Sequence, residues 1–324
     1  MWLLALALSA CDASSAPDAT DLADAADPPD SGDDAQAPLA DGGSAGDLTP
    51  RTVSGTFTLT LDAGAFAPTA AHPSALVYLP SGFRPTAPLS LIVYLHGFSN
   101  CVENIVRDAG QPCTPGGGVR SAYALAAQLE ASGKNAMLLC PEAAFDQATG
   151  NPGNLGAAGG LRALVQETLA DLQPQLAPLT VADVGTVIVA SHSGGYQAAG
   201  AIAARGGLPV SEIFLLDSLY DGTLFDAWVK SDLTSLAGTA PAHRFADVYL
   251  SGGTTATNSV AMANRAATWV APDAGILRDD RITATFTDGD YRHGLVFKAS
   301  ALAHDAIPRF YFGALVSTSQ LPAK

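Results

Sequence analysis

Short apolar runs alternate with helix-period segments along most of this chain. Runs rich in β-branched and aromatic residues predict strands, whereas apolar residues at helical spacing, as at 121–131 and 161–172, predict helices. The predicted strands lie at 53–61, 74–79, 89–95, 135–140, 186–190, 212–216, 246–250 and 281–287. Runs such as LSLIVYL at 89–95 are apolar throughout, which is typical of strands buried on both faces of a parallel sheet. The pattern predicts an α/β fold, a mostly parallel sheet of about eight strands with helices on both faces.

The first fifty residues break this alternation. An apolar stretch, MWLLALALSAC at 1–11, precedes a segment at 12–50 that consists mainly of Asp, Ala, Pro, Ser and Gly. Such a composition buries too little apolar surface to offset the entropy lost on ordering, so it predicts disorder. We therefore expect an acidic disordered tether at 11–50 and one folded domain at 51–324.

The apolar stretch ends in LSAC at 8–11, which resembles the bacterial lipoprotein signal, in which the chain is cut before a cysteine that then carries lipid. The resemblance implies a signal peptide at 1–10 and a lipid on Cys11 that tethers the protein to a membrane surface. The implied location is the bacterial cell envelope, or a secreted form. The stretch lacks the basic residues that usually open such a signal, which leaves an ordinary apolar N-terminus as the alternative.

Most of the net charge belongs to the first fifty residues. The chain of 324 residues carries a formal net charge of −15. Ten of its 31 Asp and Glu residues lie in this segment, and none of its 16 Lys and Arg residues does. The remainder is only mildly acidic and has no basic patch, which argues against a nucleic-acid partner.

The segment TVIVASHSGGYQAAGAIAAR at 186–205 contains the strongest candidate for chemistry. A buried strand leads almost directly into Ser193, and a helix of small residues follows. Gly194 and Gly195 allow the sharp turn and the close packing that this junction needs. A serine on a tight turn between a strand and a helix is the nucleophile-elbow arrangement, which exposes the hydroxyl at the edge of a sheet.

This segment resembles the elbow of the α/β-hydrolase family, written G-x-S-x-G, although Ser191 replaces the first glycine. The resemblance implies the α/β-hydrolase fold, with Ser193 as the nucleophile. The stretch VYLPSGFRPTAPLSLIVYLHGFSN at 77–100 also looks like secreted esterases of the feruloyl-esterase and polyhydroxyalkanoate-depolymerase type.

A second motif, HGF at 96–98, follows a predicted strand and is similar to the H-G-x turn of the same family. In that family, backbone N–H groups form an oxyanion hole, which stabilises negative charge on the attacked carbonyl oxygen. The resemblance implies that Phe98 and Gly194 donate these N–H groups. It also implies that Gly97 lets the backbone approach the substrate and that His96 supports the loop.

The family order along the chain is serine, acid, histidine. Three histidines follow Ser193, and the family places its base in the loop after the last strand. His293, in DGDYRHGLVF after the strand predicted at 281–287, is therefore the expected base. His304 lies in the predicted terminal helical region, where a surface or structural histidine is expected. His243 precedes a strand and so belongs at the wrong edge of the sheet.

The acid is expected one strand earlier than its usual place in the family. The usual loop holds SGGTT at 251–255, which contains no carboxylate. Asp217 ends the strand predicted at 212–216, a position that some family members use, so it is the expected acid. Asp288 and Asp290, close in sequence to His293, are the alternatives. The alternative interpretation of Asp217 itself is a turn or helix-capping residue.

The cysteines and the cofactor motifs add two further expectations. Cys101 and Cys113 flank the loop after HGF and could form a disulfide in an oxidising envelope, with Cys140 left unpaired in the core, although other pairings stay open. No His, Cys or Asp cluster has the spacing of metal ligands, and no GxGxxG follows a strand. The sequence thus predicts neither a metal nor a cofactor.

Together these residues predict a serine hydrolase that cleaves a carboxylic ester, in a small molecule or a polymer, through an acyl-enzyme. Ser193 would attack the carbonyl, His293 would transfer the proton and Asp217 would orient the imidazole. A serine peptidase or amidase with the same triad is an alternative. A non-catalytic surface binding module on the same scaffold is another, because a fold does not fix a function.

Overall fold

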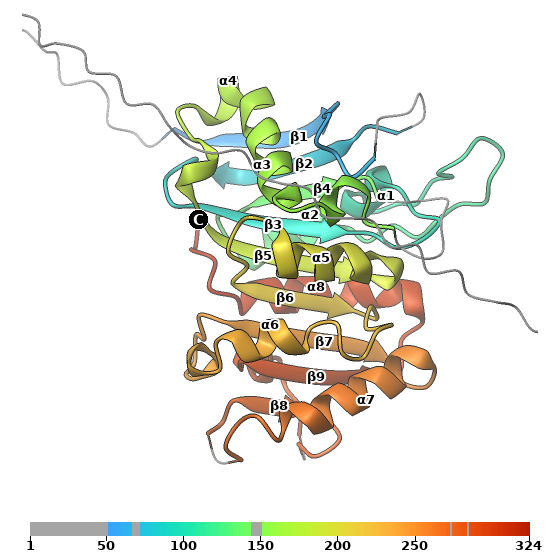
Figure 1. Cartoon of the computed structure of the whole chain (residues 1–324). Helices are drawn as coiled ribbons and strands as arrows, with labels where there is room; N and C mark the ends of the chain where they lie inside the picture. Colours follow the sequence, from blue (N-terminus) through green and yellow to red (C-terminus); the bar gives the residue numbers. More distant parts are fainter. Residues whose placement is uncertain (1–50, 67–71, 144–150, 273, 284) are drawn as a thin grey trace, which may run out of the picture. The chain divides into compact units, whose positions relative to one another are not determined.

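The computed structural model describes residues 51–66, 72–143, 151–272, 274–283 and 285–324 (Figure 1). The signal peptide expected at 1–10, the tether expected at 11–50 and the lipid expected on Cys11 lie outside the described residues. No helix within the described residues combines the length and the apolar character needed to cross a bilayer.

A nine-stranded sheet runs through the described part of the chain, in the order β1-β2-β4-β3-β5-β6-β7-β9-β8 (Figure 1). The strands are β1 Val53–Leu59, β2 Ala75–Phe83, β3 Leu89–Leu95, β4 Met137–Pro141, β5 Val184–His192, β6 Glu212–Leu216, β7 Arg244–Leu250, β8 Leu277–Asp279 and β9 Leu295–Ser300. β2 pairs antiparallel with both β1 and β4, and every other neighbouring pair is parallel. This topology confirms the predicted α/β fold class and its α/β-hydrolase architecture.

Helices cover both faces of the sheet and close two separate apolar cores. The helices are α1 Val102–Val106, α2 Leu125–Ser132, α3 Gly160–Asp171, α4 Gln173–Leu176, α5 Tyr196–Arg205, α6 Asp226–Ser231, α7 Thr254–Ala266 and α8 Ile307–Ser317. α3 to α7 pack on one face and α1, α2 and α8 on the other. Side chains along β3 point alternately to the two faces of the sheet. Leu91 and Val93 pack in the first core, and Ile92 and Tyr94 pack in the second.

The last strand of the sheet is not where the sequence pattern predicted it. The described residues of 281–287 contain no strand, whereas β9 occupies Leu295–Ser300, which the pattern assigned to a helix. A run of six residues with three apolar ones at its start has no clear period, so it fits either element. The correction matters because His293 now precedes the last strand instead of following it.

A buried ion pair joins the amino-terminal ends of β6 and β7. Arg244 Nε lies 2.5 Å from Glu212 Oε2, and both side chains are almost completely buried. Arg244 also donates to the carbonyl oxygens of Tyr291, at 2.6 Å, and Leu315, at 2.8 Å. The guanidinium therefore fastens two strands to the carboxyl-terminal helix.

We expect Arg244→Met to lower the free energy of unfolding by about 3–5 kcal/mol, because it leaves the Glu212 carboxylate buried without its partner. Urea unfolding of the variant and the parent protein measures this loss. Arg265→Met is the matched control, since Arg265 pairs with Asp226 at a partly exposed site, where an ion pair contributes about 0–1 kcal/mol. Equal losses in the two variants would contradict the assigned role of Arg244.

Candidate active site

Ser193 lies between β5 and α5, where the backbone turns sharply. Its φ of 51° falls in the left-handed region that residues other than glycine rarely adopt. Such a conformation costs on the order of 1–3 kcal/mol and persists only where surrounding contacts fix it. Ser193 opens the 3-10 turn η3, Ser193–Gly195, which leads directly into α5. The local structure is thus a strained turn from strand to serine to helix.

Ser191, the residue that departs from the family's glycine, has a defined place beneath this turn. Its side chain is fully buried, and its Oγ lies 2.9 Å from Ser218 Oγ. Ser218 Oγ in turn donates to the backbone oxygen of Ser193 at 2.9 Å. Two hydroxyl groups therefore connect the end of β5 to the loop after β6. The departure from the motif adds a contact that helps to fix the turn.

The loop after β3 packs directly against Ser193, and glycine makes the approach possible. A Cβ atom placed on Gly97 would lie 2.6 Å from Ser193 Cβ and 3.2 Å from Ser193 Oγ. A Cβ atom placed on Gly195 would lie 2.5 Å from the backbone oxygen of Leu95. This packing brings the peptide between Gly97 and Phe98 next to the serine, as an oxyanion hole formed by Phe98 and Gly194 requires.

His96 is buried and bonds to the backbone on both sides of its ring. Nδ1 donates to the oxygen of Gly97 at 2.9 Å, and Nε2 accepts from the N–H of Ala143 at 3.0 Å. Glu142 Oε1 lies 3.1 Å from the same Nε2. Burial alone would lower the pKa of His96, but the Glu142 carboxylate, the hydrogen bond to Gly97 and the charge of Glu103 together outweigh it, so the pKa is raised. His96 therefore links the loop at Gly97 to the segment after β4 and stabilises it.

Asp217 and His304 form the close acid–histidine pair of this site. Asp217 follows β6 with a φ of 54°, and its Oδ2 lies 2.5 Å from His304 Nδ1. Its Oδ1 accepts from the N–H of Leu250 at 3.0 Å. Burial would raise the pKa of Asp217, but hydrogen bonds from His304, Thr255 and the Leu250 N–H together lower it. A carboxylate kept ionised beside Nδ1 holds the imidazole with Nε2 free to accept a proton.

The structure corrects the expectation that His293 is the base. His293 Nδ1 donates to the oxygen of Gly275 at 2.6 Å, and the residue precedes β9, at the amino-terminal end of that strand. Ser193 and Asp217 follow the carboxyl ends of β5 and β6, which lie at the opposite edge of the parallel sheet. Of the three histidines that follow Ser193 in the chain, His304, which follows β9, is the one on the same edge as Ser193.

The alternative acids lie on the edge that carries His293. Asp288 and Asp290 belong to the 3-10 turn η5, Asp288–Arg292, which leads into β9 from its amino-terminal side. Asp290 Oδ1 accepts from Arg278 Nε at 3.1 Å, and its Oδ2 accepts from the N–H of Thr287 at 2.7 Å. The structure therefore joins Asp217, and not these residues, to a histidine on the Ser193 edge.

Two tyrosines and a histidine adjoin Ser193 without having been selected from the sequence. Burial, helped by the nearby Asp217 carboxylate, raises the pKa of the Tyr220 hydroxyl, so it stays protonated. The Tyr196 ring lies 5.6 Å from the Tyr220 ring, centroid to centroid. The buried His192 ring lies 4.3 Å from the ring of His304. Position beside Ser193 and Asp217 in the sequence was the available signal for all three.

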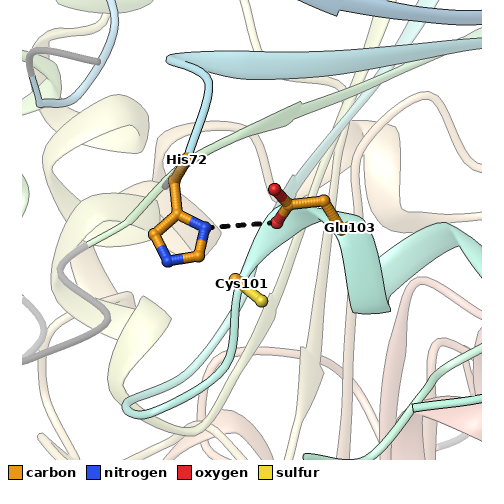
Figure 2. Close-up of side chains that lie close together, drawn as sticks. All are labelled: His72, Cys101 and Glu103. Atoms are coloured by element: carbon orange, nitrogen blue, oxygen red, sulfur yellow. Dashed lines mark ion pairs between the residues drawn. The ribbon is translucent and has the colours of Figure 1, made fainter. Parts of the chain in front are cut away.

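One of the two groups of potential metal ligands in the described residues is His72, Cys101 and Glu103 (Figure 2). His72 Nδ1 lies 3.4 Å from Glu103 Oε2, and His72 Nε2 donates to the oxygen of Cys113 at 2.6 Å. The Cys101 sulfur is bonded to Cys113 and has no thiolate to offer a metal. We therefore interpret this group as a brace for the loop that the disulfide closes.

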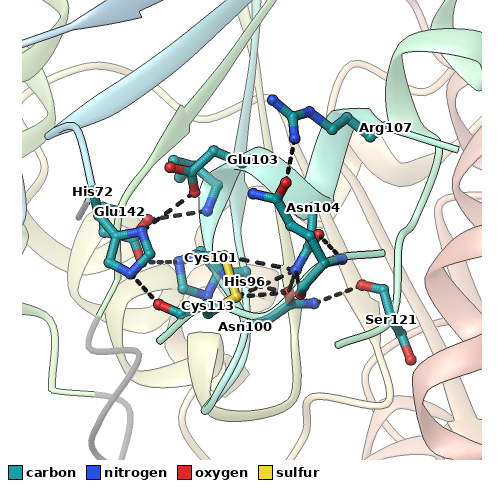
Figure 3. Close-up of a disulfide and its surroundings, with 12 residues drawn as sticks. His72, His96, Asn100, Cys101, Glu103, Asn104, Arg107, Cys113, Ser121 and Glu142 are labelled. Atoms are coloured by element: carbon teal, nitrogen blue, oxygen red, sulfur yellow. Dashed lines mark hydrogen bonds and ion pairs between the residues drawn. A yellow bond between two sulfur atoms is a disulfide. The ribbon is translucent and has the colours of Figure 1, made fainter. Parts of the chain in front are cut away.

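Cys101 and Cys113 form the expected disulfide, with an S–S distance of 2.10 Å (Figure 3). Asn104 supports the closed loop, since its Oδ1 accepts from the N–H of Gln111 at 2.9 Å and its Nδ2 donates to the Gln111 oxygen at 3.0 Å. Cys140 is free and buried, as expected, and burial raises the pKa of its thiol. Cys101 lies three residues after Phe98, so the disulfide stiffens the segment beside the serine.

The second group of potential ligands combines His192, His304 and Asp305, each with one ligand atom within 4.8 Å of the others. Sequence spacing did not reveal this group, because His192 lies far from the other two along the chain.

Neither a scan of protein-family models nor a search of curated proteins finds a match to this sequence. Solved structures with a related fold include a feruloyl esterase module from Clostridium thermocellum complexed with sinapinate, a substrate-bound fluorophosphonate-binding serine hydrolase of Staphylococcus aureus, and brefeldin A esterase, a bacterial homologue of human hormone-sensitive lipase. Their identities are 11%, 11% and 15%, and their TM-scores are 0.47, 0.44 and 0.40. The matches cover 83%, 83% and 86% of this chain and 95%, 99% and 78% of theirs. Likenesses this distant carry no conclusion about activity, which has to come from the site itself.

Proposed function

We propose that this protein is a serine hydrolase that cleaves a carboxylic ester through an acyl-enzyme. The observation that carries the proposal is the convergence of three elements on one edge of the sheet. Ser193 occupies a strained turn after β5, Asp217 follows β6, and His304, bonded to Asp217 at 2.5 Å, follows β9. A nucleophile, a base and a group that orients the base are the set that activates a serine hydroxyl.

In the proposed mechanism, Ser193 Oγ attacks the ester carbonyl while His304 Nε2 accepts its proton. Asp217 stabilises the imidazolium that forms, and the N–H groups of Phe98 and Gly194 stabilise the oxyanion. The leaving alcohol departs with the proton from His304, and the acyl group stays on Ser193. A water molecule, deprotonated by His304, then releases the acid and restores the serine.

Two features favour a substrate with an apolar part. Phe98 is 47% exposed and directly follows Gly97, which packs against Ser193. Tyr220 is 38% exposed and lies three residues after Asp217. Exposed aromatic side chains near a reactive group can bind apolar parts of a substrate and orient them. An amide or peptide is the alternative substrate for the same triad.

We also propose that the protein is anchored to a membrane surface through lipid on Cys11. The LSAC sequence at 8–11 supports this location, and so does the Cys101–Cys113 disulfide, because disulfides persist in oxidising compartments. Incorporation of radiolabelled palmitate that is lost in the Cys11→Ala variant would test it.

Covalent labelling tests the proposed nucleophile independently of the substrate. We expect a fluorophosphonate to modify Ser193 with a stoichiometry of about one per chain, because only an activated serine reacts at a useful rate. Peptide mapping by mass spectrometry identifies the modified residue. A series of p-nitrophenyl esters of increasing acyl length, assayed in parallel, measures the size of the acyl pocket. Absence of both labelling and turnover would favour the binding module.

A further inference from the structure

His192, His304 and Asp305 gather where the loop after β9 crosses the end of β5. Each residue offers one nitrogen or carboxylate oxygen within 4.8 Å of those of the other two. The His192 side chain is 1% exposed, that of His304 33% and that of Asp305 59%, so the group reaches solvent through His304 and Asp305. A buried histidine, a partly exposed histidine and an exposed carboxylate thus lie close enough together to bind one small cation.

Both imidazole rings are oriented by a hydrogen bond at Nδ1. His192 Nδ1 donates to the backbone oxygen of Leu216 at 2.7 Å, and His304 Nδ1 donates to the Asp217 carboxylate at 2.5 Å. A histidine that binds a metal almost always donates its other ring N–H to a carbonyl or carboxylate in this way, which fixes the ring and raises its basicity. Both rings therefore have Nε2 as the nitrogen available to a ligand.

His192 Nε2 faces Asp305 Oδ1 at 3.4 Å, and a neutral ring leaves this contact without a proton. A carbonyl oxygen cannot donate, so the ring proton of neutral His192 has to sit on Nδ1, next to Leu216. A lone pair then points at a carboxylate oxygen, and a cation between them converts this repulsion into two bonds.

The 3.4 Å between His192 Nε2 and Asp305 Oδ1 also equals the distance expected between two ligands of a tetrahedral metal ion. Two ligands bound at about 2.1 Å and separated by the tetrahedral angle lie about 3.4 Å apart. Two imidazole nitrogens and one carboxylate oxygen form a ligand set that suits zinc, whereas calcium and magnesium prefer oxygen ligands alone. Asp305 Oδ2 keeps a further contact with Ser121 Oγ, at 3.4 Å, which helps to orient the carboxylate.

We propose that His192 Nε2, His304 Nε2 and Asp305 bind a Zn²⁺ ion, with the fourth position open to solvent. The consequence for activity rests on the proposed function, in which His304 Nε2 is the base. A zinc ion occupies the same lone pair that would accept the Ser193 proton, so zinc binding and proton transfer exclude each other. Zinc would then inhibit the hydrolase reversibly, and its removal would restore the base.

Titration of the tag-free full chain, freed of metal by a chelator and then of the chelator, tests the site directly. Isothermal calorimetry with ZnCl₂ is expected to show one site per chain, and Co²⁺ is expected to give the visible absorption of a four-coordinate complex. Asp305→Asn removes a ligand at an exposed position and is expected to weaken zinc binding about tenfold or more. Asp171→Asn, at the exposed end of α3, is the matched control and is expected to bind zinc as the parent does.

The outcomes separate the site from the proposed function. Absence of zinc binding, or equal affinity in Asp305→Asn and the parent, would overturn the metal site whether or not the protein hydrolyses esters. Turnover of a p-nitrophenyl ester, expressed for each variant relative to its own metal-free value, tests the shared histidine. If zinc inhibits turnover and the inhibition reaches its plateau at the zinc concentration that saturates the calorimetric site, the result supports a single His304 used by both the metal site and the hydrolase. Full turnover with zinc bound would overturn that sharing and leave the serine mechanism standing.

Discussion

Replacement of His304 by alanine is expected to lower kcat for a p-nitrophenyl ester by on the order of 10⁴-fold or more, because it removes the group that we propose accepts the Ser193 proton. The reason is the position of His304 after β9, on the edge of the sheet that carries Ser193, and its 2.5 Å bond to Asp217. Since the side chain is one-third exposed, its removal should leave the folded state largely intact.

His293→Ala is the matched control for this prediction. His293 is a partly exposed histidine, bonded to the backbone oxygen of Gly275, at the other edge of the sheet. Its removal is expected to change kcat by about twofold at most, as for most surface substitutions. Steady-state kinetics of both variants, with circular dichroism to verify folding, makes the comparison. The reverse result, a large loss in His293→Ala and a small one in His304→Ala, would refute the assignment of the base.

The second large effect is expected from Ser193→Ala, which removes the nucleophile itself. We expect kcat to fall by on the order of 10⁴-fold or more, with the residual rate coming from the oxyanion hole and from substrate binding. Fluorophosphonate labelling should disappear in the same variant. Stability should change little or rise, because the contacts that fix the turn are made by the backbone oxygen of Ser193 and by Gly97, which alanine leaves in place.

Ser191→Ala distinguishes loss of the nucleophile from loss of the turn. Ser191 is two residues away and bonds to Ser218, so its removal weakens the support of the turn and keeps the reactive hydroxyl. A partial loss of activity is expected, far smaller than that of Ser193→Ala. Retention of turnover in Ser193→Ala, measured after exclusion of contaminating esterase by active-site titration, would refute the serine mechanism.

Two short motifs, one of them around Ser193, carried most of the sequence information about the site. HGF at 96–98 and SHSGG at 191–195 each follow an apolar run that became a strand, β3 and β5, so their place at one edge of the sheet followed from local pattern. Asp217 was found in the same way, at the end of β6. The disulfide between Cys101 and Cys113 was one of several pairings that the sequence allowed, and the structure contains it.

The histidine could not be found by the same reasoning, because its assignment depended on one ambiguous segment. Leu295–Ser300 is too short to show a period, and assigning it to a helix placed the last strand before His293 instead of after it. Because the last strand was predicted too early in the chain, His293 was expected after it, at the edge of the sheet that carries Ser193. In the structure, His293 precedes this strand and His304 follows it. The choice of the candidate histidine therefore depended more on the bounds of one strand than on residue types.

By itself, the sequence determined the α/β class, the order of the motifs and the identity of the strained serine, because these depend on hydrophobic period and on residues that are neighbours in the chain. Only the tertiary structure decided which histidine meets Asp217 and that His192 lies over His304 beside Asp305. These contacts join residues 87 and 113 positions apart, brought together by the pairing of parallel strands across the sheet. The free energy that selects such contacts comes from packing of the whole core, which no short segment of sequence contains.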